Sequence, residues 1–216
     1  MAFIYHAEIS PTKLQLVTTW APTQLWFPGD SGAEFSLVAS YRFDDPAGEV
    51  GIETLLVRAG DGPVLQIPLT YRGAPLAGAE AWLITTMTHS VLGERWVYDA
   101  TGDPVYLAAV ARAALTGGHE AEQFHDVDGV KVLRPSTATV SGSGEPGASV
   151  VTMPHIEAVS TEQATESTVV ETDALRLVVM RLPGAEGGAA PEATAVLTGT
   201  WAGQQEPHLL VSVTLR

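Results

Sequence analysis

The chain of 216 residues contains no cysteine, and this absence excludes several kinds of site at once. Without thiols there are no disulfides, no thiolate-bound metals and no cysteine nucleophiles. Hydrophobic runs are short as well, since none reaches the roughly 18 apolar residues that a membrane-spanning helix needs. The opening residues, MAFIYHAEIS, lack the basic and apolar regions of a secretory signal, so we expect a cytoplasmic protein.

Positive charge is scarce. Lysine and arginine together number 11 against 25 acidic residues, which gives a net charge of −14. The only lysines are Lys13 and Lys131. A surface this negative repels nucleic-acid backbones and anionic lipid headgroups, so we expect neither nucleic acid nor membrane as a partner.

Most of the sequence has the length and composition of short β-strands separated by turns. The turn at residues 60–63, Gly-Asp-Gly-Pro, predicts an antiparallel hairpin between its two flanking strands. We predict strands at residues 2–9, 13–20, 35–43, 50–58, 64–71, 81–87, 122–127, 131–140, 167–170, 175–182, 194–201 and 208–215.

One helix is expected, at about residues 104–116. Asp103 is a suitable N-cap, Pro104 fits the first turn, and Gly117 and Gly118 end the apolar pattern. Because this helix is apolar on nearly all sides, it should lie at the centre of the domain. The fold class is therefore α+β, a mainly antiparallel β-sheet protein with one central helix.

The glycine- and serine-rich residues 141–149 are typical of a loop or hinge. We expect them to divide the chain into a domain at residues 1–140 and a C-terminal β segment at residues 150–216 that packs on it. In the alternative, both parts form a single domain.

Sequence motifs of catalysis are missing. The chain has no phosphate-binding loop ending in Gly-Lys-Ser or Gly-Lys-Thr and no Gly-x-Ser-x-Gly elbow. His119 and His125 lie in an acidic stretch, but their spacing of six favours a solvated loop over a metal site. We therefore expect no catalytic residue, no metal and no cofactor.

The best candidates for ligand binding are His89, Arg95, Tyr98 and Asp99. Arginine forks and tyrosine hydroxyls suit anionic or hydroxyl-rich ligands. The alternative interpretation is structural, with these polar groups satisfied locally at the end of an element. Trp26 is a further candidate, because an indole ring can stack on a sugar, although aromatic residues beside proline more often cover a small core.

The segment at residues 78–118, GAEAWLITTMTHSVLGERWVYDATGDPVYLAAVARAALTGG, resembles the N-terminal cap domain of actinobacterial maltokinases and its stand-alone relatives. In that family a mostly β cap precedes a kinase fold that phosphorylates maltose with ATP and magnesium. The resemblance extends loosely to TEQATESTVVETDALRLVVMRLP, which is similar to strands of the kinase N-lobe. It implies a fold of cap plus remnant N-lobe strands.

The same resemblance implies a lysine in the last of these strands, but Val178 stands at or beside that position. The chain also ends at Arg216, before a catalytic lobe. We therefore expect a non-catalytic interaction or regulatory protein of maltose, trehalose or α-glucan metabolism, acting on a sugar kinase or another pathway enzyme in trans. The alternatives are a small-molecule or carbohydrate-binding protein and, less favoured, an uncharacterised enzyme.

Overall fold

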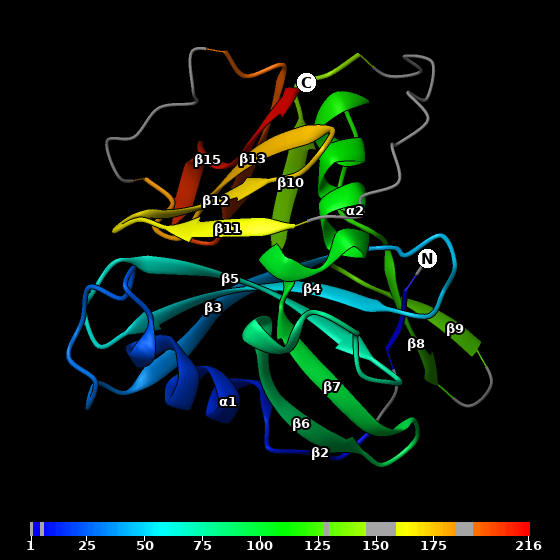
Figure 1. Ribbon diagram of the computed structural model, residues 1–216. Coiled ribbons are helices and arrows are strands. Elements are labelled where there is room, and N and C mark those ends of the chain that lie inside the picture. The colour runs from blue at the N-terminus through cyan, green and yellow to red at the C-terminus, as the bar shows by residue number, and fades with distance from the viewer. Residues whose placement is uncertain (1, 5–6, 128–129, 146–158, 185–191) are drawn as a thin grey trace.

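Three β-sheets and two α-helices make up the computed structural model, which describes residues 2–4, 7–127, 130–145, 159–184 and 192–216 (Figure 1). The N-terminal sheet has the strand order β2-β6-β7-β5-β4-β3 and the C-terminal sheet the order β10-β14-β15-β13-β12-β11. The small sheet has the order β1-β8-β9. Every pairing within the two large sheets is antiparallel, and β1 with β8 is parallel.

The strands of the N-terminal sheet are β2 (Ile9–Ser10), β3 (Phe35–Phe43), β4 (Gly51–Ala59), β5 (Val64–Arg72), β6 (Leu83–His89) and β7 (Gly93–Asp99). Those of the C-terminal sheet are β10 (Ala138–Gly142), β11 (Ser160–Gln163), β12 (Ser167–Glu171), β13 (Leu175–Met180), β14 (Ala195–Trp201) and β15 (Gln204–Leu215). The small sheet contains β1 (Ala2–Ile4), β8 (Gln123–Val127) and β9 (Val130–Arg134). The helices are α1 (Lys13–Trp20) and α2 (Pro104–Leu115), with 3-10 turns η1 (Ala21–Thr23), η2 (Glu80–Trp82) and η3 (Ala100–Gly102).

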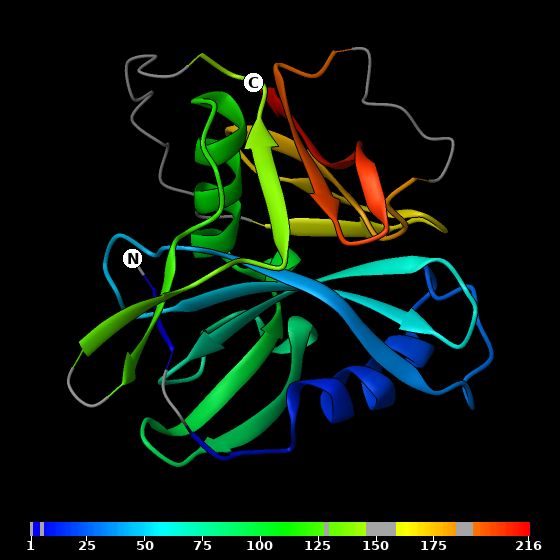
Figure 2. The ribbon, with the colours of Figure 1, turned by 180° about the vertical axis from the view of Figure 1, so that it is seen from behind.

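The N-terminal sheet is buried on both faces, which explains the nearly continuous apolar run in β4. Leu55 and Val57 pack on the α1 side, while Ile52 and Leu56 belong to the core shared with α2 and the C-terminal sheet. Figures 1 and 2 show the two large sheets as layers one above the other, with α1 on the far side of the N-terminal sheet from α2. The N-terminal sheet is therefore a layer covered on both faces, and α2 lies in the core that the two large sheets share.

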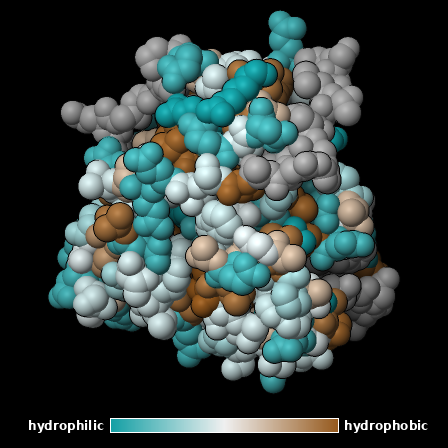
Figure 3. All heavy atoms as spheres, viewed as in Figure 1, coloured by the Kyte–Doolittle hydropathy of each residue, from teal (hydrophilic) through white to brown (hydrophobic). Residues whose placement is uncertain are grey.

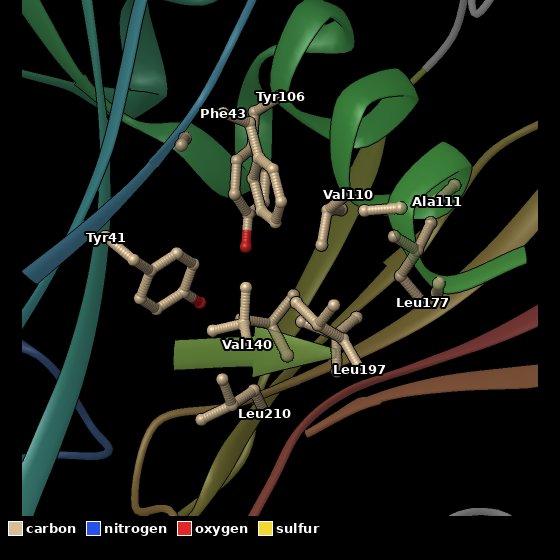
Figure 4. Close-up of a cluster of buried hydrophobic side chains, with 14 of the residues drawn as sticks. Tyr41, Phe43, Tyr106, Val110, Ala111, Val140, Leu177, Leu197 and Leu210 are labelled. Atoms are coloured by element: carbon tan, nitrogen blue, oxygen red, sulfur yellow. The ribbon is translucent and has the colours of Figure 1, made fainter. Parts of the chain in front are cut away.

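The predicted helix is confirmed as α2. Asp103 caps it by accepting a hydrogen bond from the backbone N–H of Val105, and Gly117 adopts a positive φ of 64° just after its end. One side of α2 packs on β10, β14 and β15, and Figure 4 shows Tyr106 and Val110 of α2 in the same buried cluster as Tyr41 of the N-terminal sheet. The mostly antiparallel α+β architecture, including the hairpin between β4 and β5, is confirmed as well.

The strand predicted at residues 13–20 is wrong, because this segment is helix α1. Thr12 and Gln15 form a capping box, in which each side chain bonds to the backbone N–H of the other residue. Leu16 and Val17 are buried on the helix face toward the sheet. This short helix uses the spacing of Leu16, Val17 and Trp20, which a strand interpretation overlooks.

Two further predictions need correction. Residues 131–140 are not one strand but two, β9 and β10, which lie in different sheets. Residues 93–99, which lie outside every predicted strand, form β7, an inner strand of the N-terminal sheet. The strand predicted at residues 2–9 contains β1 and the start of β2, with residues 5–6 outside the described part of the chain.

The expected division of the chain at residues 141–149 falls at a place where strands meet. Residues 141–142 belong to β10, which pairs with β14, while residues 146–149 lie outside the described residues. One hydrophobic core combines Tyr41, Tyr106, Val140 and Leu197 from both sides of the proposed boundary (Figure 4). Among the described residues, no helix has the length and hydropathy of a membrane span.

Candidate functional site

Strand register gathers polar side chains on one face of the N-terminal sheet. Side chains alternate between faces along a strand, and paired residues share a face. Arg42 pairs with Glu53, Tyr71 pairs with Gly51 and Val97, and Arg95 lies two residues before Val97. These residues therefore continue the face that α1 covers elsewhere with apolar contacts.

Glu53 is the buried centre of this polar group. Its Oε2 lies 2.5 Å from Lys13 Nζ, at the start of α1, and accepts a hydrogen bond of 3.1 Å from the Tyr71 hydroxyl. Arg42 Nη1 lies 3.9 Å from the other carboxylate oxygen. Burial alone would raise the pKa of Glu53, but the charges of Lys13 and Arg42, with hydrogen bonds from Lys13 and Tyr71, hold it below its ordinary value. Glu53 is therefore an ionised anchor for two cations.

A cavity of about 540 Å³ opens beside this group. Basic side chains of Lys13, Arg42 and Arg95 line it together with Tyr71 and His89. Acidic residues line it too, on the turn between β3 and β4: Asp44, Asp45 and Glu49. Asp45 is committed to that turn, where its carboxylate accepts hydrogen bonds from the backbone N–H groups of residues 47, 49 and 50.

Two glycines lie against the guanidinium groups, and one of them, Gly73, gives Arg95 its room. A Cβ added at Gly73 would lie 2.7 Å from Arg95 Nη1, and one added at Gly51 would lie 3.5 Å from Arg42 Nη2. Any side chain at position 73 would therefore displace the Arg95 guanidinium. Among the described residues, Arg95 has one hydrogen bond, from Nη2 to the carbonyl of Leu92.

His89 is fixed at the end of β6. Its Nδ1 accepts hydrogen bonds from the backbone N–H groups of Val91 and Leu92, at 3.2 and 3.1 Å. The proton of the neutral ring is consequently on Nε2. Partial burial, followed by the charges of Arg95 and Lys13, lowers the pKa of His89, so the ring is neutral at pH 7.

The five residues expected from the sequence lie in three different places. His89 and Arg95 come together at the cavity. Tyr98 is buried and turned to the other face, where its hydroxyl accepts a hydrogen bond from the backbone N–H of Leu76. Asp99 and Trp26 are buried around Arg181, a residue that the sequence did not single out.

Arg181 joins the two large sheets. Its Nη2 lies 2.6 Å from Asp99 Oδ2, its Nε donates to Thr168 Oγ1, and its guanidinium lies 4.9 Å from the centre of the Trp26 ring. Both Arg181 and Trp26 are completely shielded from solvent. Trp26 is thus part of a buried contact, and its ring has no face open to a sugar.

Lys13, Arg42, Glu53 and Tyr71 were not predicted as site residues. They come from four different elements: strand pairing brings Arg42, Glu53 and Tyr71 together, and Lys13 reaches Glu53 from helix α1. The alternation of Gly51, Glu53 and Leu55 along one strand is the signal that places a carboxylate on a mostly apolar face.

For the metal site considered at His119 and His125, the structure describes the surroundings of His119 alone. His119 Nδ1 lies 3.2 Å from the carbonyl oxygen of Val140, and the His125 side chain is outside the described part of the molecule. Within the described residues, no three histidine or acidic side chains are grouped as metal ligands would be.

A separate surface lies on β9, an edge strand of the small sheet. All five of its residues are exposed, including Val130 at 61%, Val132 at 39% and Leu133 at 52%. Its two charged residues, Lys131 and Arg134, are both basic, and Lys131 Nζ lies 4.0 Å from the centre of the Phe124 ring. Elsewhere, on the face in Figure 3, hydrophilic and hydrophobic residues are interspersed.

Comparisons with known proteins confirm the resemblance over part of the chain. Residues 20–103 match the family model of the maltokinase N-terminal cap domain, which is less than half of the chain. The match covers the N-terminal sheet from β3 to β7 and ends before α2, so it begins and ends earlier than the segment 78–118. A comparison with curated proteins gives no match.

Among solved structures, the chain is similar to a glucosamine kinase in complex with glucosamine, ADP and inorganic phosphate. The TM-score is 0.46 at 17% sequence identity. The similarity covers 96% of this chain and 41% of that chain, so the chain spans about two fifths of the length of the kinase.

Proposed function

We propose that the chain is a non-catalytic docking or regulatory protein of maltose, trehalose or α-glucan metabolism, which binds a sugar kinase or another enzyme of that pathway in the cytoplasm. The match of residues 20–103 to the maltokinase cap supports the pathway. The edge of β9, which no strand of the described residues pairs with, is the observation that supports docking. An edge strand with exposed apolar side chains is a template for pairing with another chain.

The charge of β9 indicates the chemistry of the partner. Lys131 and Arg134 give this strand a positive charge on a chain whose net charge is −14. The partner is accordingly expected to offer an acidic and apolar strand, because opposite charges across a strand pair are favourable.

The proposal that the chain does not catalyse phosphoryl transfer rests on β13. A kinase needs a cation close to the nucleotide phosphates. In β13 Val178 stands at or beside the expected position, and the one cation of the strand, Arg176, pairs with Glu171 and Glu192.

Binding of the purified chain to a recombinant maltokinase tests this proposal. Affinity is measured by biolayer interferometry, and the kinase rate is measured with and without the chain. Leu133→Asp should weaken binding at least tenfold, because it places a charge on the pairing edge, whereas Leu25→Asp should leave it unchanged. Leu25 is the matched control, since it is 75% exposed and lies far along the chain from β9. Equal binding by both variants, or no binding to any enzyme of the pathway, would refute docking through β9.

A second candidate function is the binding of a small molecule or carbohydrate. The observation in its favour is the cavity that His89 and Arg95 line. Its volume of about 540 Å³ lies in the range of small-molecule sites. Thermal-shift measurements with maltose, trehalose and ATP test it, and the absence of any shift leaves docking as the surviving function.

A further inference from the structure

We propose that the cavity beside Glu53 binds an anionic sugar, one that carries a carboxylate or a phosphate group. The anionic group is held between Arg42 and Arg95. This inference rests on the second candidate function and names its ligand class. It does not depend on docking through β9.

The charges on the sheet wall of the cavity do not cancel. Lys13 and Glu53 form a close ion pair, with 2.5 Å between Nζ and Oε2, and so neutralise one another. Arg42 is further from Glu53, at 3.9 Å, and among the described residues no carboxylate lies within ion-pair distance of Arg95. Two guanidinium groups are thus in excess on this wall, and guanidinium binds carboxylate and phosphate oxygens bidentately.

The acidic residues of the cavity lie in the turn between β3 and β4. The carboxylate of Asp45 accepts hydrogen bonds from three backbone N–H groups of the same turn, and Asp44 has an interaction of its own. Asp44 and Glu49 are exposed to solvent, whereas Arg42 and Arg95 are partly buried. Water therefore screens these two carboxylates better than the guanidinium groups, and an anion is expected to bind at the sheet.

The wall also offers a surface for a sugar ring. The aromatic ring of Tyr71 lines the cavity, and its centre lies 5.7 Å from Lys13 Nζ. An aromatic ring and two guanidinium groups around one cavity suit a ligand with both a sugar ring and a negative charge.

Gly73 shows that the sheet is shaped around the guanidinium of Arg95. Its backbone is not in the left-handed region, so alanine fits the backbone at this position, but its Cβ would lie 2.7 Å from Arg95 Nη1. Gly73→Ala therefore moves the guanidinium without removing its charge.

Isothermal titration calorimetry with glucose 6-phosphate, glucuronate, inorganic phosphate and neutral glucose tests the inference. Glucose 6-phosphate or glucuronate should bind, and glucose should bind at least tenfold more weakly. The difference between the two anionic sugars identifies the group that the site accepts. Raising the salt from 0.1 M to 0.5 M should weaken binding severalfold, because an ion pair is screened.

Variants locate the site. Arg95→Gln and Gly73→Ala should each weaken binding of the anionic sugar at least tenfold, while Arg58→Gln, which changes an exposed arginine of the same sheet, should have no effect. Should either variant fail to fold, the NMR signal of the Arg95 Nε–H group in the unmodified chain provides the second measurement, and it should shift on titration.

The outcomes separate the two functions. Equal binding of glucose and glucose 6-phosphate would overturn the oxyanion inference but support carbohydrate binding. No binding of any probe would overturn both, and an affinity unchanged by Arg95→Gln would place the ligand elsewhere. None of these results bears on the binding of a kinase through β9.

Discussion

Arg181 and Asp99, 82 residues apart in the chain, form a buried ion pair with 2.6 Å between Nη2 and Oδ2. The pair connects the end of β13 in the C-terminal sheet to the end of β7 in the N-terminal sheet. Gln66 adds a second connection, since its side-chain amide donates to the carbonyl oxygens of Met180 and Leu210. Polar groups thus fix how the two apolar layers meet.

Removing one partner of this pair should destabilise the protein strongly. Asp99→Ala leaves the guanidinium of Arg181 buried without a counter-charge, and the expected loss in the free energy of unfolding is about 3–5 kcal/mol. Urea denaturation followed by tryptophan fluorescence measures it. The double variant Asp99→Ala, Arg181→Met should recover part of the loss, and a double variant as unstable as Asp99→Ala would contradict this account.

Asp103 has two roles, so its loss should cost more than a cap alone. It caps α2 and also receives two hydrogen bonds of 2.7 Å from Arg72, one to each carboxylate oxygen. We expect Asp103→Ala to lower the free energy of unfolding by about 2–4 kcal/mol, from a lost cap and a broken buried ion pair. Asp61→Ala, in the exposed turn of the β4–β5 hairpin, is the control and should change it by less than about 0.5 kcal/mol.

Glu53 should make stability depend on pH in the acid range. Its pKa in the folded protein lies below the ordinary value of 4.5, so the unfolded chain binds the proton more readily. Its contribution is fully present above pH 4.5 and is lost as the pH falls through the folded pKa. Urea titrations between pH 7 and pH 3 should show a smaller loss of stability for Glu53→Gln than for the unmodified chain. Glu49→Gln, an exposed change, should follow the unmodified chain, and an identical slope for all three would disprove the assignment.

The buried side chains of helix α1 should contribute to the stability of the protein. Leu16→Ala removes a side chain that is 4% exposed, and the expected cost is about 2–4 kcal/mol. Leu25→Ala, at a position 75% exposed, should cost less than about 0.5 kcal/mol. Thermal unfolding followed by circular dichroism compares the two, and equal values would argue against burial of α1.

The elements with strong local signals could be predicted from the sequence. Asp103, Pro104 and Gly117 mark the ends of α2, and the glycines of residues 60–63 mark the hairpin between β4 and β5. Helix α1 could not be distinguished from a strand by composition, because its eight residues span two turns and include three β-branched side chains.

Only some residues of the candidate site could be predicted from the sequence, because the others come together through the arrangement of the strands. His89 and Arg95 are close in sequence because one hairpin carries them. Arg42 and Glu53 pair across a second hairpin, β3 with β4. The approach of the two hairpins to each other and to Lys13 depends on the order of strands in the sheet, which local pattern does not specify. Tyr98 and Asp99 follow Arg95 directly, yet Tyr98 lies on the other face and Asp99 is buried against Arg181.

The two-sided burial of β4 has a consequence for any shortened version of the protein. The family match ends at residue 103, but Tyr41, Ile52 and Leu56 within it are covered by α2 and the C-terminal sheet. A fragment limited to residues 20–103 would expose that apolar surface to water and lose its stability. The recognisable unit of sequence is thus smaller than the unit that folds, and experiments on the matched region require the chain through β15.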